Sequence, residues 1–231
     1  MRESAPREGN NLMTTRILFA TVVLSVAAWI SSANADSVTF NFTGTVNTVA
    51  APLAGTFNTT QSLSGSFTFD SNSADLQIDP NIGLYRVVVP NSLSFSIGSY
   101  SGGQVGPSNS DLNVIYIQND NPDQYTGDWV NSISGPAVGS YNPIEFFIDL
   151  TEPSNAVFSN DALPLLPPSL AAFSNRRWGL LFTNEIDVMR VEGTLTSLTV
   201  ATPEPTTFLL GGTGLVGFAL AYWRGRRRAS H

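Results

Sequence analysis

The chain contains no cysteine and no lysine, and its one histidine is His231 at the end of 231 residues. Thiol chemistry, lysine Schiff bases and the cysteine–histidine sites that hold zinc are therefore excluded. A Ser-His-Asp triad is excluded as well, because the body of the chain offers no histidine. Charged residues make up only 13% of the chain, about half of the usual share. This low charge content argues against a typical cytosolic enzyme.

Serine, threonine and asparagine instead supply 66 residues. Their side chains compete with the helical backbone for hydrogen bonds, so this composition favours strands and turns. Residues 36–202 carry 15 aspartates and glutamates against four arginines, which gives this region a net charge of about −11. We expect no nucleic acid partner, because phosphate binding needs a basic face.

The N-terminal region has the three parts of a secretory signal peptide. Arg16 precedes an apolar run at residues 17–30, and Ala33-Asn34-Ala35 follows with small residues at the positions that signal peptidase requires. The pattern predicts a signal peptide over residues 1–35, a true start at Met13 and cleavage before Asp36. The alternative, a retained anchor, is disfavoured because the run ends in small polar residues and lacks charged stop-transfer flanks.

The C-terminal region also has three parts. Pro203-Glu204-Pro205 is followed by sixteen uncharged residues, 208–223, and then by Arg224, Arg226, Arg227 and Arg228. A sixteen-residue helix is about 24 Å long, which is short for a hydrocarbon core of about 30 Å. The pattern predicts a short transmembrane helix at 208–223, with the arginines in the cytoplasm and residues 36–202 outside.

This order of tripeptide, apolar segment and terminal arginines resembles the PEP-CTERM sorting tail of Gram-negative bacterial proteins, over residues 203–228. The resemblance implies processing by an exosortase, a membrane-embedded protease or transpeptidase, in bacteria that make exopolysaccharide and biofilm. It assigns recognition to Pro203, Glu204 and Pro205, and retention to the arginine cluster. The implied route runs from signal peptidase, through an inner-membrane intermediate, to the cell envelope or the extracellular space.

Residues 36–202 show hydrophobic alternation with a period of two, which is typical of half-buried strands. Turn-forming stretches such as Ser101-Gly102-Gly103 separate these runs. We therefore expect one all-β domain, an antiparallel β-sandwich or jelly roll. A phase change between Leu195 and Leu198 predicts a bulge or bend, and Ser169 begins a candidate short helix. The expected strands include residues 38–43, 63–69, 93–97, 112–117, 146–150, 178–182 and 191–200.

Carboxylates are the abundant reactive groups of this domain, and a glycoside hydrolase needs two of them. Glu145 and Asp149 alternate with Phe146, Ile148 and Leu150, so we expect both carboxylates on a solvated strand face. Glu145 and Glu152 are the hydrolase candidates. The sequence marks no convergent pair, so the solvated face is the favoured interpretation.

Two oxygen-rich segments are candidate calcium loops. Asp120, Asp123 and Asp128 lie in a segment, 119–129, that the sequence predicts to be a long loop, and Asp70, Asn72 and Asp75 form a weaker second group. Calcium takes six to eight oxygen ligands, but neither spacing matches an EF-hand. Ordinary acidic turns are the favoured interpretation, and we assign no metal ligand.

Aromatic residues near predicted loops suggest a further alternative, a carbohydrate-binding module that stacks rings on sugars. These residues also fit a second role, capping the core, which is more common. We conclude that the sequence predicts an exported, non-enzymatic β-domain without a cofactor, with exopolysaccharide binding and Asp/Glu hydrolysis as alternatives. The aromatic residues concerned are Tyr100, Tyr125, Trp129 and Tyr141.

Overall fold

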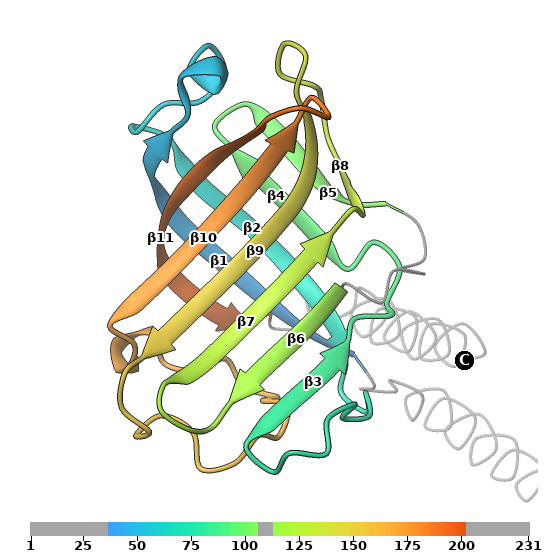
Figure 1. Ribbon diagram of the computed structural model, residues 1–231, viewed down its shortest axis with the longest axis vertical. Helices are drawn as coiled ribbons and strands as arrows, with labels where there is room; N and C mark the ends of the chain where they lie inside the picture. Colours follow the sequence, from blue (N-terminus) through green and yellow to red (C-terminus); the bar gives the residue numbers. More distant parts are fainter. Residues whose placement is uncertain (1–36, 106–112, 202–231) are drawn as a thin grey trace, which may run out of the picture.

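The computed structural model describes residues 37–105 and 113–201. In these ranges the chain forms eleven strands and two single-turn 3-10 helices (Figure 1). The strands are β1 (Ser37–Val49), β2 (Ser62–Asp70), β3 (Ile82–Arg86), β4 (Leu93–Ile97), β5 (Tyr100–Gln104), β6 (Asn113–Gln118), β7 (Asp123–Val130), β8 (Ile133–Ser134), β9 (Asn142–Glu152), β10 (Asn175–Thr183) and β11 (Val188–Val200); the 3-10 turns are η1 (Ala51–Leu53) and η2 (Leu170–Ala172).

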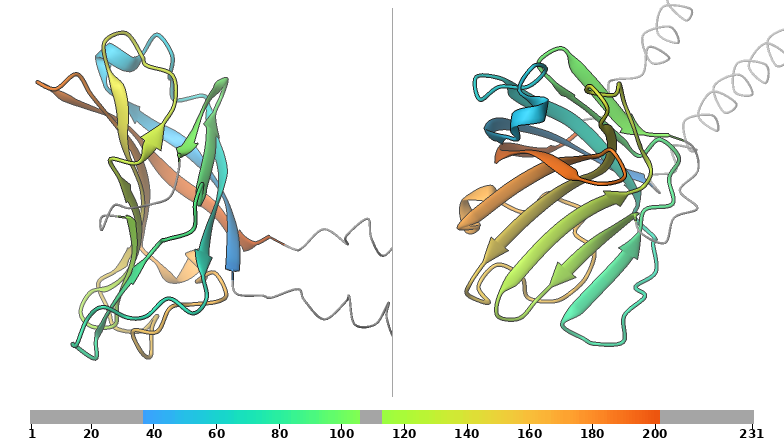
Figure 2. Two further views of the ribbon diagram at one scale, coloured as in Figure 1. Left: turned by 90° about the vertical axis from the view of Figure 1, so that its right-hand side faces the viewer. Right: turned by 45° about the horizontal axis from the view of Figure 1, so that its top comes forward.

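All strand pairs are antiparallel and belong to one sheet with the order β3-β6-β7-β9-β10-β11-β1-β2-β4-β5-β8. The all-β antiparallel class predicted from the sequence is therefore confirmed. The sheet curls so that β1, β2, β4 and β5 form a layer opposite β6, β7, β9 and β10 (Figure 2). The layers are parts of one continuous sheet, which differs from the two separate sheets expected of a sandwich.

The curl passes through the β1–β11 pair. Its register shifts twice, between Thr43 and Gly44 and between Val46 and Thr48, and such bulges bend and twist a strand pair. The first shift leaves Thr196 without a register partner, which confirms the irregularity predicted between Leu195 and Leu198. The backbones approach so closely here that a Cβ atom on Gly193 would collide with the carbonyl oxygen of Thr45.

Aromatic rings fill the space between the two layers. Phe146 of β9 stacks on Phe42 of β1 and Phe95 of β4, with ring centroids 5.6 and 4.8 Å apart. Trp129 of β7 contacts Phe67 of β2 at 5.3 Å. All five side chains are at least 96% buried. Since these contacts join strands that are distant in the sheet order, the aromatic core holds the curl closed.

Four strands were missed by the sequence analysis: β3, β5, β7 and β8. The turn-forming stretch Ser101-Gly102-Gly103 lies inside β5, and most of the predicted loop 119–129 is β7. The predicted short helix is a single 3-10 turn with Ser169 at its N-cap position. These strands were missed because they contain glycine, aspartate or serine, which have a low propensity for strands. Pairing with neighbouring strands in the folded protein outweighs this low propensity.

The segment before β3 covers the open edge of that strand. Leu84 donates its backbone N–H to Oδ1 of Asp75 (2.9 Å), and the N–H of Leu76 donates to the carbonyl of Leu84 (3.0 Å). Unpaired edges can recruit strands from other molecules, and a carboxylate on an edge opposes this pairing. Asp75 therefore both occupies an edge donor and charges the edge.

We expect Asp75→Ala to increase self-association and to lower the free energy of unfolding by about 1 kcal/mol, since one edge N–H loses its acceptor. Sedimentation velocity at increasing protein concentration and urea unfolding measure the two effects. Asp79→Ala is the matched control, because among the described residues the Asp79 carboxylate accepts a hydrogen bond from Asn81 in its own turn and none from the β3 edge. Equal self-association of the two variants would show that Asp75 does not protect the edge.

Candidate functional sites

The two ends of the described domain lie side by side (Figures 1 and 2). Phe40 near the start of β1 is in register with Val200 at the end of β11, and the N–H of Ala201 donates to the carbonyl of Thr39 at 2.9 Å. The predicted signal-peptide cleavage site comes just before β1 in the sequence, and the Pro-Glu-Pro tripeptide comes just after β11. The fold therefore brings the chain next to both predicted processing points to the same place on the surface.

The residues assigned to processing lie outside the described residues. This holds for Ala33, Ala35 and Asp36, for Pro203, Glu204 and Pro205, and for Arg224, Arg226, Arg227 and Arg228. The predicted signal peptide at 1–35 and the predicted transmembrane helix at 208–223 also lie outside them. Within 37–105 and 113–201, no helix has the length and apolar character needed to cross a membrane.

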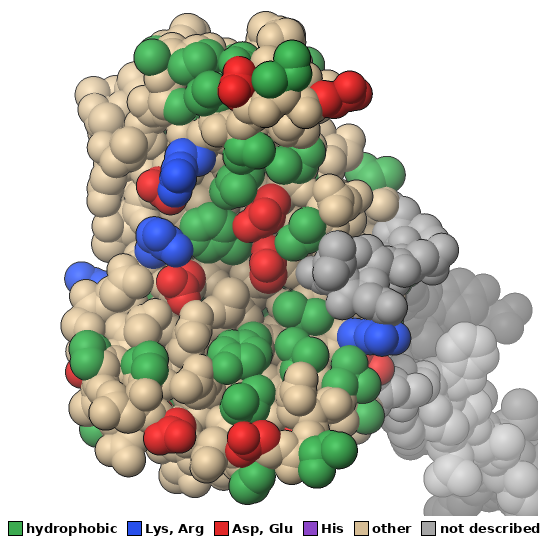
Figure 3. Space-filling model, in the orientation of Figure 1, with side chains coloured by type: hydrophobic (Ala, Val, Ile, Leu, Met, Phe, Trp, Pro, Cys, Tyr) green, Lys and Arg blue, Asp and Glu red, His purple; other side chains and the backbone are tan. Residues whose placement is uncertain are grey.

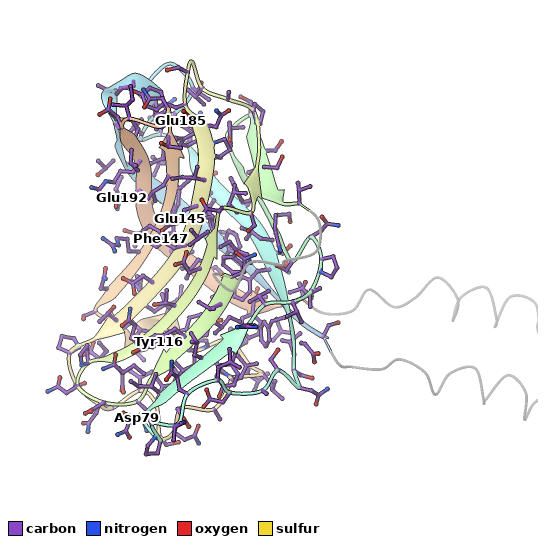
Figure 4. All side chains as sticks on the ribbon, turned by 45° about the vertical axis from the view of Figure 1, so that its right-hand side comes forward. Asp79, Tyr116, Glu145, Phe147, Glu185 and Glu192 are labelled. Atoms are coloured by element: carbon purple, nitrogen blue, oxygen red, sulfur yellow. The ribbon has the colours of Figure 1, made fainter. Side chains whose placement is uncertain are left out.

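The outward face of β7, β9 and β10 carries the domain's central charged cluster (Figures 3 and 4). The sequence analysis placed Glu145 and Asp149 on one outward face of their strand, and the burial pattern of β9 confirms this. Arg177 of β10 lies 3.6 Å from Oδ2 of Asp149 and 5.1 Å from the ring centroid of Phe147. The guanidinium group of Arg177 also lies 4.0 Å from Oε1 of Glu192.

Asp128 is the unusual member of this cluster. It pairs in register with Phe147, two positions along from the Val130–Glu145 pair, so that Asp128 and Glu145 are diagonal neighbours on the same face. Burial, and secondly the nearby charge of Glu145, raise the pKa of Asp128 from 3.8 to about 7, against a lowering contribution from the backbone of Trp129. Oδ1 of Asp128 is buried and has no hydrogen-bond partner among the described residues. Burial also raises the pKa of Glu145.

The structure brings Asp128 to Glu145 and does not bring Glu152 to it. Glu145 and Glu152 are seven positions apart on β9, a distance of about 23 Å in an extended strand. Burial opposes ionisation of Glu152, yet hydrogen bonds from Ser174 and Ser154 hold its pKa below the usual value. The pair of hydrolase candidates taken from the sequence is therefore not a convergent one. The proximity of Asp128 to Glu145 was missed, because it depends on the β7–β9 register.

The first candidate calcium loop is corrected by the structure. Asp123 and Asp128 are both in β7, where alternation sends Asp123 into the core and Asp128 outward. Oδ2 of Asp123 accepts hydrogen bonds from the N–H groups of Val157 and Phe158, at 2.7 and 3.3 Å. Asp123 thus fixes the chain that follows β9.

The second candidate group has local roles. Asp70 accepts from the N–H of Asn72 at 2.8 Å, and Asp75 holds the β3 edge. In the described part of the chain no three acidic or histidine side chains come together as a metal site would require.

The aromatic residues considered for sugar binding are mainly core residues. Tyr125 and Trp129 are fully buried on the inward side of β7, and Tyr100 is 4% exposed at the start of β5. Trp129 donates its indole N–H to Oγ of Ser92 at 3.1 Å. Tyr141 is half-buried in the turn before β9. The core-capping interpretation is therefore correct for the first three, and stacking on sugars by Tyr125 or Trp129 is excluded by their burial.

Residues 37–105 and 113–201 thus form an acidic β-domain that precedes the C-terminal tail. Residues 201–228 match the family model of the PEP-CTERM protein-sorting motif. The chain thus carries a PEP-CTERM sorting signal, and the motif implies export and membrane-associated processing by an exosortase. No curated protein and no solved structure matches the chain.

Proposed function

We propose that the protein is a non-enzymatic component of the cell envelope or extracellular matrix, exported with a signal peptide and sorted through its C-terminal tail. The observation that carries the proposal is the PEP-CTERM motif at residues 201–228. The fold supports this proposal, because the first and last residues of the described domain lie next to each other on its surface. A domain with this geometry is held by both membrane-directed segments until each has been processed.

Two alternatives accompany this proposal. An exopolysaccharide-binding module is compatible with an exported β-domain. However, Tyr125 and Trp129 are buried and cannot stack on sugars, so they no longer support this alternative. An Asp/Glu glycoside hydrolase has one supporting observation, the raised pKa of Asp128 beside Glu145. Carboxyl pairs with a purely structural role show the same rise in pKa. The raised pKa of Asp128 alone therefore leaves the non-enzymatic role favoured over the hydrolase.

Intact-mass measurement of the protein purified from an exosortase-containing producer tests the sorting proposal. We expect a chain that begins at Asp36 and lacks Arg224 to His231. Replacement of Pro203-Glu204-Pro205 by three alanines should leave the tail attached, as should deletion of the exosortase from the producer. A wild-type protein that keeps Arg224 to His231 would show that the tail is an ordinary single-pass anchor.

A further inference from the structure

The outward side of the layer opposite the charged cluster carries almost only hydroxyl and amide side chains. We call this surface the hydroxyl face. Within β1, β2 and β4, Asp70 at the end of β2 is the only outward-facing charged residue. The hydroxyl face consists of Thr39, Asn41, Thr43, Thr45 and Asn47 of β1; Ser62, Ser64, Ser66 and Thr68 of β2; Ser94 and Ser96 of β4; and Thr194, Thr196 and Thr199 of β11.

Hydrogen bonds across the strands fix these side chains. Ser64 and Ser96 lie 2.9 Å apart (Oγ–Oγ), and Ser66 and Ser94 lie 3.1 Å apart. Comparable contacts join β1 to both of its neighbours, at 2.7 to 3.0 Å: Thr39–Thr68, Thr43–Thr196 and Asn47–Thr194. Each hydroxyl has one donor and two acceptor positions. A pair therefore keeps acceptor positions and one proton free for a ligand, in a preorganised array.

The threonines of the hydroxyl face are good strand formers, but its serines and asparagines are not residues that strand stability favours. Strands prefer β-branched and aromatic residues and are depleted of asparagine. Yet β1 holds Asn41 and Asn47 at outward positions, and β2 and β4 hold five outward serines. The amide of Asn41 makes no side-chain hydrogen bond within the described residues, although it lies between Ser66 and Thr199 in register. Departures from local propensity are expected at functional surfaces.

We propose that the hydroxyl face binds a neutral polysaccharide. A neutral sugar chain offers hydroxyl donors and acceptors along its whole length, which matches the array of Ser, Thr and Asn side chains. Covering this face removes almost no charge from water, so the desolvation cost is small. Serine and threonine also lose little side-chain entropy on binding, and many weak contacts along a polymer add up.

The chemistry favours a neutral polymer over an anionic one. Residues 36–202 carry a net charge of about −11, and β1, β2 and β4 contain no arginine to offset it. A polyanion would therefore be repelled by the domain and find no cation on the part of this face that β1, β2 and β4 form. A second copy of the chain is the other conceivable occupant, and the experiment below separates it from a polysaccharide.

The test is affinity electrophoresis of the mature protein in native gels. The gels contain either the neutral or the acidic fraction of the producer's extracellular polysaccharide, separated by anion exchange. We expect retardation by the neutral fraction. Ser64→Glu should weaken it at least tenfold, whereas Ser64→Thr should keep it. The matched control is Asn175→Glu, which adds the same charge at an exposed outward position of β10.

Each outcome decides the proposal, provided that thermal unfolding shows the variants to be folded. No retardation by the neutral fraction, or equal retardation of the Ser64→Glu and Asn175→Glu proteins, would overturn it. A dimer that Ser64→Glu alone dissociates, without polysaccharide binding, would assign the face to a second copy. This proposal rests on the proposed function in one respect, namely that the exported protein meets the producer's extracellular polysaccharide. The binding assay with purified protein is independent of the tail-processing measurement, so the two proposals can fail separately.

Discussion

Replacement of Asp128 by asparagine is expected to stabilise the domain, and to do so increasingly as the pH rises from 4 to 7. The folded state holds the pKa of Asp128 at about 7, against an ordinary value of 3.8. Between these values the folded protein binds more protons than the unfolded chain, so its free energy of unfolding falls as the pH rises. Asparagine resembles the protonated acid and avoids this loss.

The size of the gain follows from the shift. A rise of the Asp128 pKa from 3.8 to about 7 corresponds to about 4 kcal/mol at full burial. The side chain is partly solvated, so we expect about 2 kcal/mol above pH 7. Urea unfolding of both proteins at pH 4, 6 and 8 measures the difference. Glu145→Gln should give a smaller gain with the same pH dependence, because the charge of Glu145 is the second cause of the shift.

Asp149→Asn is the matched control for this experiment. Asp149 lies on the same outward face of β9, but Arg177 is 3.6 Å from its carboxylate. The variant should therefore show no gain at pH 8. A gain from Asp128→Asn that is equal at pH 4 and pH 8 would contradict the prediction, because it would come from packing and not from ionisation.

The proximity of Asp128 to Glu145 illustrates what the sequence alone could and could not predict. Hydrophobic alternation predicted the outward position of Glu145, because Phe146, Ile148 and Leu150 mark the opposite side of β9. It could not predict β7, where Asp123, Gly127 and Asp128 are weak strand formers. Once β7 was missed, no argument could place Asp128 beside residue 145, since that proximity depends on register across the sheet.

The curl of the sheet shows the same division. The bulge in β11 was visible as a phase change between Leu195 and Leu198, a local property of one strand. The curl that follows from this bulge was not visible, because β1 pairs with its neighbour β2 on one side and, on the other, with β11, which lies more than 100 residues later in the sequence. The period of a pattern identifies a strand and its buried side, but it carries no information about the strand's partners. The all-β class was therefore predictable, whereas the single continuous sheet was not.

Phe146→Ala is expected to give the largest loss of stability, about 3–5 kcal/mol. The Phe146 ring is fully buried and lies within 6.4 Å of four other rings, those of Phe42, Phe95, Trp129 and Trp178. These rings come from both layers, so alanine would leave a cavity at the place where the curled sheet meets itself. For a domain of this size the thermal midpoint should fall by about 10 °C or more.

Phe147→Ala is an unusually close control, because it removes the same side chain from the next position of the same strand. Phe147 points outward and is only partly buried, with Arg177 at 5.1 Å from its ring centroid. Its loss should cost about 1 kcal/mol or less. If Phe146→Ala fails to fold, Phe146→Leu keeps the comparison, with an expected loss between the two. Equal losses for positions 146 and 147 would show that the space between the layers is not the core of the domain.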